Sequence, residues 1–446
     1  MNGREELKGM RHWPYQLTDY EAARVRDVLD SHDACSAWVI LSRSYNGFVR
    51  EAALRGLSDH MGVEALEVLF ERLNDWVPQV REQAVLGLEK YLVPEKADLL
   101  LRVLGRLLAL TNKQRTDHGA TLAKARATLL AESVRRQVEE AFLGSTGKAS
   151  RFLFGVLIEE SEGRMGLLEN SVVHRDPTVR QLAVDACAGL PAIQALPLLE
   201  RAMQASGASV RVKALRVLLT LIEDPRAHLR AAMFDASAAM RCLARWAAPR
   251  WQLDCRQELL SRLAGPVPGS KREWLGLIGL AKDLNEPLAD PMLARALMLS
   301  SVNVRLQALN ALGERGVMQQ IEALNDPSDK VFNAAIVLLR QQPRSCFEVS
   351  LEQLLNTQWY QLPEPRRWLL LTLKPGWRQL EYLLLRHEQE LEQSDYWLDQ
   401  LARCCSTRNT LLDSSTPKMH RQALQQRLQE LEESGALPGG SVSLLK

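Results

Sequence analysis

Apolar residues recur at intervals of three and four along most of the chain, a pattern that predicts amphipathic helices. The segment from Glu64 to Leu73, EALEVLFERL, shows this period clearly. Polar turns that contain Asp, Asn, Gly or Pro separate such segments from one another. We therefore predict an all-α chain built from short helices.

A short sequence word recurs within this helical pattern. Phe48-Val49-Arg50-Glu51-Ala52-Ala53 returns as Gln79-Val80-Arg81-Glu82-Gln83-Ala84, and the two arginines lie 31 residues apart. In each full copy the Val and the Ala lie four apart, on one helical face, where the small Ala lets a neighbouring helix approach closely. Further copies begin at Thr178, Ser209, His228 and Asn303, and a degenerate one begins at Lys330.

The turns before several copies contain Asp-Pro, as at Asp176-Pro177, Asp224-Pro225 and Asp326-Pro327. Asp caps the N-terminus of a helix and Pro is tolerated in its first turn, so the pair starts a new helix. The repeating unit is therefore helix, Asp-containing turn, helix. One such pair cannot bury its apolar stripe, whereas stacked pairs share a continuous core, as in an α-solenoid.

The pattern LxxLL…DxxxxVRxxAxxxL resembles the HEAT repeat, including the HEAT-like repeats of bacterial proteins, most strongly over residues 33–92 and 164–247 and also over 287–341. The resemblance implies an armadillo-like helical solenoid of stacked antiparallel helix pairs with a divergent C-terminal helical region. It also implies that the Asp and Arg of the word tie adjacent repeats together in a ladder. The ladder positions are Asp75, Arg81, Asp176, Arg180, Arg211, Arg305 and Asp326.

Departures from the repeat divide the chain further. We expect an N-terminal cap at 1–32, HEAT-like repeats at 33–92, a helical insertion at 93–163, repeats at 164–264 and 265–345, a divergent helical region at 346–432 and a flexible tail at 433–446. Within the insertion we expect one helix from Ala97 to Leu110 and one long helix from His118 to Phe142.

Charge is nearly balanced over the 446 residues, with 56 Lys and Arg against 54 Asp and Glu, but it is unevenly distributed. Residues 101–136 carry eight Lys or Arg against two acids, and residues 201–260 carry ten against five. These stretches are either solvated helix faces or a surface that attracts an anionic partner. Under the second interpretation the candidate partner-binding residues are Arg102, Arg106, Arg216, Arg230, Arg241 and Arg245.

The C-terminal third is acidic and aromatic, with six acids against one Arg over residues 381–400. Aromatic side chains at helical spacing are typical of a core, and the alternative is an interaction surface.

No catalytic constellation accompanies the repeats. The stretch GSTGKA from Gly144 lacks the spacing of a phosphate-binding loop, and HEQEL from His387 lacks the second His of a zinc protease. The seven cysteines include no CxxC pair and are interpreted as reduced thiols. We therefore predict no enzyme and no catalytic, cofactor or metal site. The absence of a long apolar run or secretory signal further predicts a cytoplasmic protein without a membrane span.

The sequence favours a non-catalytic scaffold or adaptor that binds a partner protein on a curved solenoid surface. The exposed polar positions of the helices that begin with the repeat word would make the contact: Glu51, Arg55, Glu82, Gln181, Asp185, Lys213, Arg216, Gln307 and Asn310. An inhibitory or immunity-type adaptor for one cognate protein is an alternative.

A nucleic-acid partner is a further alternative, since the chain resembles the HEAT-like alkylpurine DNA glycosylases at the level of fold. That resemblance implies phosphate contacts, aromatic contacts with bases and a carboxylate. The matching candidates are Arg211, Arg230, Arg241 and Arg245 for phosphates, Trp246 and Trp251 for bases, and Asp235 or Asp254 as the carboxylate.

Overall fold

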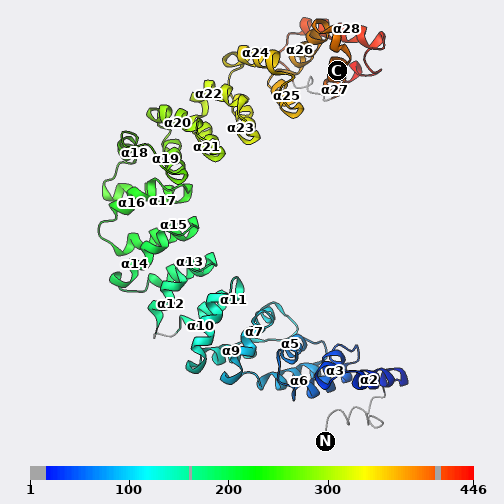
Figure 1. Cartoon of the computed structure of the whole chain (residues 1–446), viewed down its shortest axis with the longest axis vertical. Coiled ribbons are helices and arrows are strands. Elements are labelled where there is room, and N and C mark those ends of the chain that lie inside the picture. Colours follow the sequence, from blue (N-terminus) through cyan, green and yellow to red (C-terminus); the bar gives the residue numbers. More distant parts are fainter. Residues whose placement is uncertain (1–16, 160–162, 407–412, 446) are drawn as a thin grey trace. The chain divides into compact units, whose positions relative to one another are not determined.

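The computed structural model describes residues 17–159, 163–406 and 413–445 (Figure 1). All regular secondary structure in these three ranges is helical, and they contain no β-strand. The chain forms two compact units, Met1–Pro225 and Arg226–Lys446. The first 16 residues of the predicted N-terminal cap lie outside the described residues.

The first unit is a series of antiparallel helix pairs. Its elements are α2 (Asp19–Ser31), α3 (Ala34–Leu41), α4 (Gly47–Leu57), α5 (Val63–Arg72), α6 (Pro78–Glu89), η1 (Pro94–Lys96), α7 (Ala97–Arg102), α8 (Leu104–Ala109), η2 (Leu110–Asn112), α9 (Gly119–Leu130), η3 (Glu132–Val134), α10 (Arg135–Gly144), α11 (Lys148–Leu157), α12 (Arg164–Ser171), α13 (Pro177–Cys187), α14 (Ala192–Met203) and α15 (Ala208–Leu221).

The repeat word begins the second helix of four pairs in this unit. It starts α4, α6, α13 and α15, which pack against their first helices α3, α5, α12 and α14. The second helices also pack on one another, α4 on α6 and α13 on α15. The Val and Ala of the word are fully or almost fully buried at these contacts, as at Val80 and Ala84. Burial of this face is the main stabilising term of the stack.

The predicted helical insertion differs from its expected form. The helix from Ala97 is interrupted at Val103, and the long helix from His118 is two helices, α9 and α10, because Ala131 is extended (φ −62°, ψ 133°). The buried positions explain the second break: Leu129 and Val134 are both buried but lie five apart, and one straight helix cannot place them on the same face. The chain therefore turns, and α10 pairs with α11, which packs on α13.

The second unit continues the same architecture. Its elements are α16 (Arg226–Met233), α17 (Ala238–Ala247), η4 (Ala248–Trp251), α18 (Cys255–Leu263), α19 (Lys271–Leu284), η5 (Pro287–Ala289), α20 (Asp290–Leu297), α21 (Val302–Leu312), η6 (Gly313–Gly316), α22 (Val317–Glu322), η7 (Ala323–Asn325), α23 (Asp329–Leu339), η8 (Arg344–Cys346), α24 (Glu348–Gln358), α25 (Glu364–Leu371), α26 (Gly376–Gln389), η9 (Leu391–Gln393), α27 (Ser394–Ser406), α28 (Lys418–Glu433) and η11 (Val442–Leu445).

Second helices again pack on second helices in this unit, α19 on α21 and α21 on α23. One assignment from the sequence is wrong. The copy of the word at His228 lies in α16, a first helix, whereas the second helix α17 carries its own copy at Met240-Arg241, with Met240 and Ala244 buried.

The aromatic residues of the C-terminal third are mainly core. Trp359 and Trp397 are almost completely buried, and their ring centroids lie 5.2 Å apart. The segment after α28, predicted to be a flexible tail, turns back and buries Leu437, Val442 and Leu445. Its element η11 packs on α27 and α28.

Stacked antiparallel helix pairs, with the Val and Ala of the repeat word buried where it occurs, define an all-α, HEAT-like solenoid. The predicted fold class is confirmed. No helix in the described part of the chain is both long and apolar enough to cross a membrane.

Candidate binding surfaces

The arginine of the repeat word holds the turn that precedes its own helix. Arg50 donates from Nη1 to the carbonyl oxygens of Ser44 (2.9 Å) and Tyr45 (2.8 Å), the residues six and five positions earlier. The same pair of bonds recurs at five further arginines, namely Arg81, Arg180, Arg211, Arg241 and Arg305. A charged donor thus satisfies carbonyls that the end of the first helix leaves unpaired.

The rest of the guanidinium connects neighbouring repeats. Arg50 binds Asp75 of the next turn in a bidentate pair, with Nη2–Oδ1 at 2.7 Å and Nε–Oδ2 at 3.0 Å, and both side chains are buried. Arg305 binds Asp326 in the same way, at 2.7 and 2.9 Å. Asp75 also accepts the Val77 N–H at 3.0 Å, so one carboxylate fixes both the ladder and its own turn.

The ladder differs in detail from the predicted set of residues. Asp176 accepts hydrogen bonds from Arg151 of α11 (Nη2–Oδ2 3.3 Å) and from the Gly147 N–H (2.8 Å). Helices assigned to the insertion therefore make an inter-repeat contact of the same kind. In the described part of the chain, Arg81 and Arg180 bond only to turn carbonyls.

The Asp carboxylates of the ladder are held ionised. Burial raises the pKa of Asp75, but hydrogen bonds from Arg50 and the Val77 N–H outweigh it, so the pKa is lowered. For Asp176 burial again raises the pKa, and Arg151 and three backbone N–H groups lower it to about 2.

The degenerate copy of the word keeps the turn contacts by another route. Phe332 replaces the arginine in α23, and Arg366 reaches back from α25 to donate to the carbonyls of Asp326 (2.7 Å) and Pro327 (3.1 Å). These residues lie six and five positions before Phe332, as the turn residues do in the intact copies. The Arg366 guanidinium also lies 4.7 Å from the Phe332 ring centroid.

The predicted partner-binding arginines fall into different environments. Arg241 is buried, holds its own turn and pairs with Asp283 (Nε–Oδ2 2.9 Å), so its guanidinium is structural and is not an exposed contact. Arg245 pairs with the same carboxylate at 3.4 Å, and Arg230 pairs with Glu258 at 2.7 Å.

The remaining candidates belong to the first unit. Arg106 lies 3.8 Å from Glu67, and Arg102 and Arg216 are exposed. Whether any of these six arginines contacts a partner stays a prediction.

Polar positions predicted to face a partner partly bond to one another. Gln181 of α13 donates to Ser209 of α15 (2.8 Å), Lys213 pairs with Asp185 (2.5 Å), and Arg55 pairs with Glu51. Glu82, Arg216 and Gln307 are exposed, and Asn310 is half-buried. Part of this face therefore stabilises the stack itself.

The residues of the glycosylase-like hypothesis also have structural contacts. Asp235 is buried, accepts the Ser237 N–H (2.8 Å) and pairs with Arg272 (3.1 Å). Asp254 caps the N-terminus of α18, because its side chain accepts the backbone N–H groups of Arg256 and Gln257. The exposed Trp246 ring stacks on Arg250 at 4.5 Å, Arg211 is buried, and Trp251 is half-buried.

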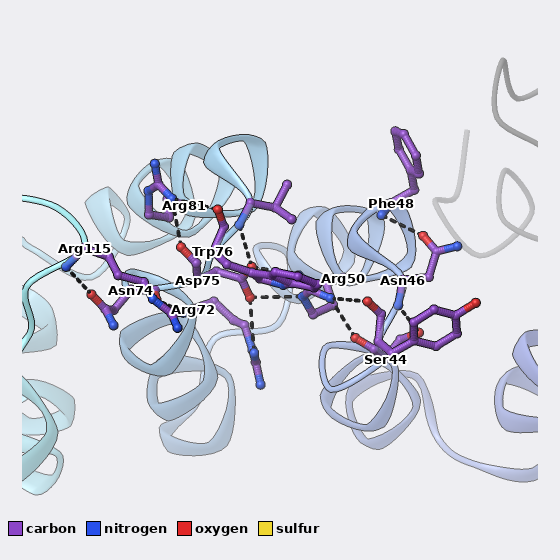
Figure 2. A network of polar contacts seen from close by, with 12 residues as sticks. Ser44, Asn46, Phe48, Arg50, Arg72, Asn74, Asp75, Trp76, Arg81 and Arg115 are labelled. Carbon is purple, nitrogen blue, oxygen red and sulfur yellow. Dashed lines mark hydrogen bonds and ion pairs between the residues drawn. The ribbon is translucent and has the colours of Figure 1, made fainter.

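An open hollow of about 720 Å³ lies in the first unit, where two successive turns and the loop after η2 meet (Figure 2). Its twelve lining residues come from segments far apart in the sequence: Ser44, Tyr45, Arg50, Glu71, Arg72, Asn74, Asp75, Trp76, Asn112, Lys113, Gln114 and Arg115. Tyr45 and Trp76 are 77% and 67% exposed, and each lies five positions before the arginine of its repeat.

The loop that closes one side of this hollow is attached to the turn of the second repeat. Arg115 donates from its backbone N–H to Asn74 Oδ1 (3.2 Å) and from Nη1 to the Asn74 carbonyl (3.3 Å), as Figure 2 shows. The sequence placed Lys113 and Arg115 in a basic stretch but gave no reason to join them to Tyr45 and Trp76. The signal that was missed is an aromatic residue at the same turn position in two consecutive repeats.

Exposed apolar side chains lie near the start of the first helix in three consecutive repeats of the second unit. Leu288, Met318 and Val349 are 62%, 62% and 80% exposed. Leu288 lies in η5, two residues before α20 begins, and Met318 and Val349 are the second residues of α22 and α24. We call these three residues the apolar row.

The described residues hold no cluster of His, Cys, Asp and Glu that could bind a metal ion. The adjacent Cys404 and Cys405 are buried, and burial raises the pKa of both thiols to about 12. Tyr360 has its pKa raised to about 12 by burial and by its hydrogen bond to Glu390.

No protein-family model matches the sequence, and no curated protein matches it. Among solved structures, a crystal structure of Kap121p is 14% identical, and one of the karyopherin Kap121p bound to the SUMO protease Ulp1p is 15% identical. Each alignment covers 99% of this chain and 48% of the other, with TM-scores of 0.32 and 0.31. The chain thus spans about half the length of Kap121p. TM-scores of this size do not establish a common fold, so the assignment as a HEAT-like solenoid rests on the helix pairs and ladder contacts described above.

Proposed function

We propose that this chain is a non-catalytic scaffold that binds a partner protein along the edge of its repeats. The apolar row carries the proposal. Single exposed apolar side chains are common on soluble proteins, but Leu288, Met318 and Val349 recur near the start of the first helix in three consecutive repeats. Because stacked helices lie roughly 10 Å apart, a partner segment that contacts all three would span on the order of 20 Å, about six or seven extended residues.

The chemistry of the partner follows from that of the row. Leu, Met and Val offer dispersion contacts and burial of apolar area, and a flexible Met adapts to the side chain that it meets. Proteins supply complementary apolar side chains, whereas a nucleic-acid backbone requires cations. The structural contacts of Asp235 and Asp254 further disfavour the glycosylase-like alternative. All seven cysteines are free thiols, which fits the predicted cytoplasmic location.

The test begins with a partner captured by the wild-type chain and then purified. The triple variant Leu288→Ser, Met318→Ser, Val349→Ser should bind that partner at least tenfold more weakly, since about 1.4 kcal/mol of lost contact is tenfold in affinity. A matched control changes Leu391, Met298 and Val337 to Ser, three residues of the same types that are also exposed. Both variants should melt within a few degrees of the wild type.

Equal affinities for the row variant and the wild type would place the partner elsewhere on the chain. A chain that retains no protein at stoichiometric level but binds duplex DNA in a salt-sensitive way would refute the scaffold in favour of the nucleic-acid alternative. An inhibitory or immunity-type adaptor is the special case in which the captured partner loses its own activity on binding.

A further inference from the structure

We propose that the hollow in the first unit binds an acidic, extended segment of the partner protein. The proposal rests on the scaffold function above, but it concerns a different unit and different residues. It assigns carboxylate recognition to Lys113 and Arg115 and apolar contact to Tyr45 and Trp76. The side chains of these four residues make none of the hydrogen bonds of the buried ladder pair, which joins Arg50 directly to Asp75.

The charges of the lining residues favour an anionic ligand. Four cations, Arg50, Arg72, Lys113 and Arg115, face two carboxylates, Glu71 and Asp75. Arg50 is neutralised by Asp75, and Arg72 is shared between Glu71 (2.9 Å) and Asp75 (3.2 Å). Neither Lys113 nor Arg115 has a carboxylate partner among the described residues, so the excess positive charge lies on the loop from residue 112 to 115.

The two aromatic rings form the apolar part of the site. Trp76 lies against the Arg50 guanidinium, 5.5 Å from the ring centroid, which supports one side of the indole and leaves most of the ring in solvent (Figure 2). Tyr45 is anchored through its hydroxyl, which bonds to Glu21, while the ring stays 77% exposed. Rigid aromatic rings give large contact area at low entropic cost, which is why they dominate binding hot spots.

The site is held in place before any ligand arrives. Arg81 donates to the carbonyls of Asp75 (2.8 Å) and Trp76 (3.2 Å), which fixes the turn that carries the indole. Asn74 of the same turn accepts both hydrogen bonds from Arg115, so the distance between the cationic loop and the turn that carries Trp76 is fixed. Preorganisation of this kind lowers the entropic cost of binding.

Cations beside aromatic rings also suit single-stranded nucleic acid, so the two ligands must be separated. A nucleic-acid strand needs a continuous positive track for its phosphates. Here the excess is confined to one loop, and the half-exposed carboxylate of Glu71 lies at the same hollow. A peptide that carries a few carboxylates between apolar side chains matches this arrangement better.

The experiment measures binding of the full chain to two short capped peptides, one of alternating Glu and Leu and one of alternating Gln and Leu. Binding of each peptide is followed by fluorescence polarisation. The acidic peptide should bind at least tenfold more tightly than the neutral one, and added salt should weaken it. The double change Lys113→Gln with Arg115→Gln should remove that difference. Trp76→Ala should weaken both peptides about tenfold.

Two control variants test whether the effects belong to this hollow. Arg136→Gln removes a cation whose side chain is 92% exposed elsewhere in the same unit, and Trp246→Ala removes an exposed indole from the second unit. Both should bind the acidic peptide as the wild type does.

Failure of the acidic peptide to bind, equal binding of the two peptides, or unchanged binding by the hollow variants would each overturn the assignment. Tighter binding of a single-stranded oligothymidylate, lost in the same variants, would assign the hollow to nucleic acid. If the captured partner binds normally to the hollow variants but not to the variant of the apolar row, only this inference fails. If the captured partner binds normally both to the hollow variants and to the variant of the apolar row, the proposed edge-binding function fails as well.

Discussion

At the scale of single residues, Arg50 and Arg305 each make two kinds of contact at once, one with their own turn and one with the carboxylate of a neighbouring repeat. Arg50 uses Nη1 for two carbonyls of its own turn and uses Nε and Nη2 for the carboxylate of Asp75. The planar guanidinium has donors on both sides, whereas an ammonium group is a point charge that cannot span both acceptors. This geometry explains why Arg, and not merely a positive charge, recurs in the word.

Arg50→Lys should therefore destabilise the first unit by about 2 to 4 kcal/mol, because it leaves part of a buried ion pair and a turn without donors. Urea unfolding followed by circular dichroism measures the change. Arg55→Lys in the same helix is the matched control, since Arg55 is 57% exposed, and its effect should stay within about 0.5 kcal/mol. Equal stabilities for the two variants would show that the buried pair is dispensable.

Asp176 gives a prediction that depends on pH. Its pKa is about 2 in the folded chain against an ordinary value of 3.8, so the ionised form stabilises the fold above pH 4 or so. That stabilisation, on the order of 1 to 2 kcal/mol, is lost as the pH falls through the folded value. The wild type should exceed Asp176→Asn in unfolding free energy at neutral pH, and the gap should close between about pH 4 and pH 2.

Asp185→Asn serves as the comparison for that experiment, because this carboxylate is half exposed and, among the described residues, pairs with Lys213 alone. Its effect at neutral pH should be within about 0.5 kcal/mol. A gap between wild type and Asp176→Asn that persists unchanged at pH 2 would mean that the carboxylate charge is not the source of the stability.

At the scale of elements, the sequence word predicted the second helices well because Val and Ala four apart must share a buried face, as at Val80 and Ala84. It misled at His228, since Leu229 and Arg230 imitate the word in a first helix. The spacing from turn to arginine does not separate the two copies, because Asp224 precedes Arg230 by six residues just as Asp235 precedes Arg241. The structure separates them: Arg241 donates from Nη1 to the carbonyls of its own turn, whereas Arg230 lies in a first helix and pairs with Glu258.

Close packing between elements depends on one glycine in particular. A Cβ atom at Gly276 of α19 would lie 1.8 Å from the Phe234 carbonyl oxygen, which is backbone and cannot rotate away. Gly276→Ala should therefore push α19 from the turn after α16 and destabilise the second unit by about 3 kcal/mol or more.

Gly105→Ala is the matched helical substitution, because nothing lies within 4 Å of its added methyl group. It should be neutral or stabilise by up to about 1 kcal/mol, since Ala favours the helix. Thermal unfolding of both variants checks the pair, and a neutral Gly276→Ala would contradict the close approach.

At the scale of the whole molecule, the sequence predicted the solenoid but not the hollow. Periodicity and the 31-residue spacing report local helices and their neighbours, which is all that a stack of repeats requires. The hollow brings together Tyr45, Trp76 and Lys113, which lie in three different turns of the chain. The position of Lys113 depends in part on the break of the predicted helix at Val103. The position of the hollow depends on packing that no pattern in one segment records.

The stack also predicts how the chain unfolds, since each repeat contacts mainly its neighbours and local changes should have local effects. Cys187 in the first unit and Cys404 and Cys405 in the second are buried, and burial raises their thiol pKa values to about 11 and 12. They should resist N-ethylmaleimide in the native chain, while the exposed Cys242 and Cys346 react.

Labelling in rising urea then tests whether the units unfold separately. Asp176→Asn should lower the urea concentration at which Cys187 is labelled, because both residues belong to the α13 repeat. The urea concentrations at which Cys404 and Cys405 are labelled should stay unchanged. Peptide mass spectrometry after brief labelling gives each midpoint, and a common shift of all three cysteines would show that the two units unfold as one.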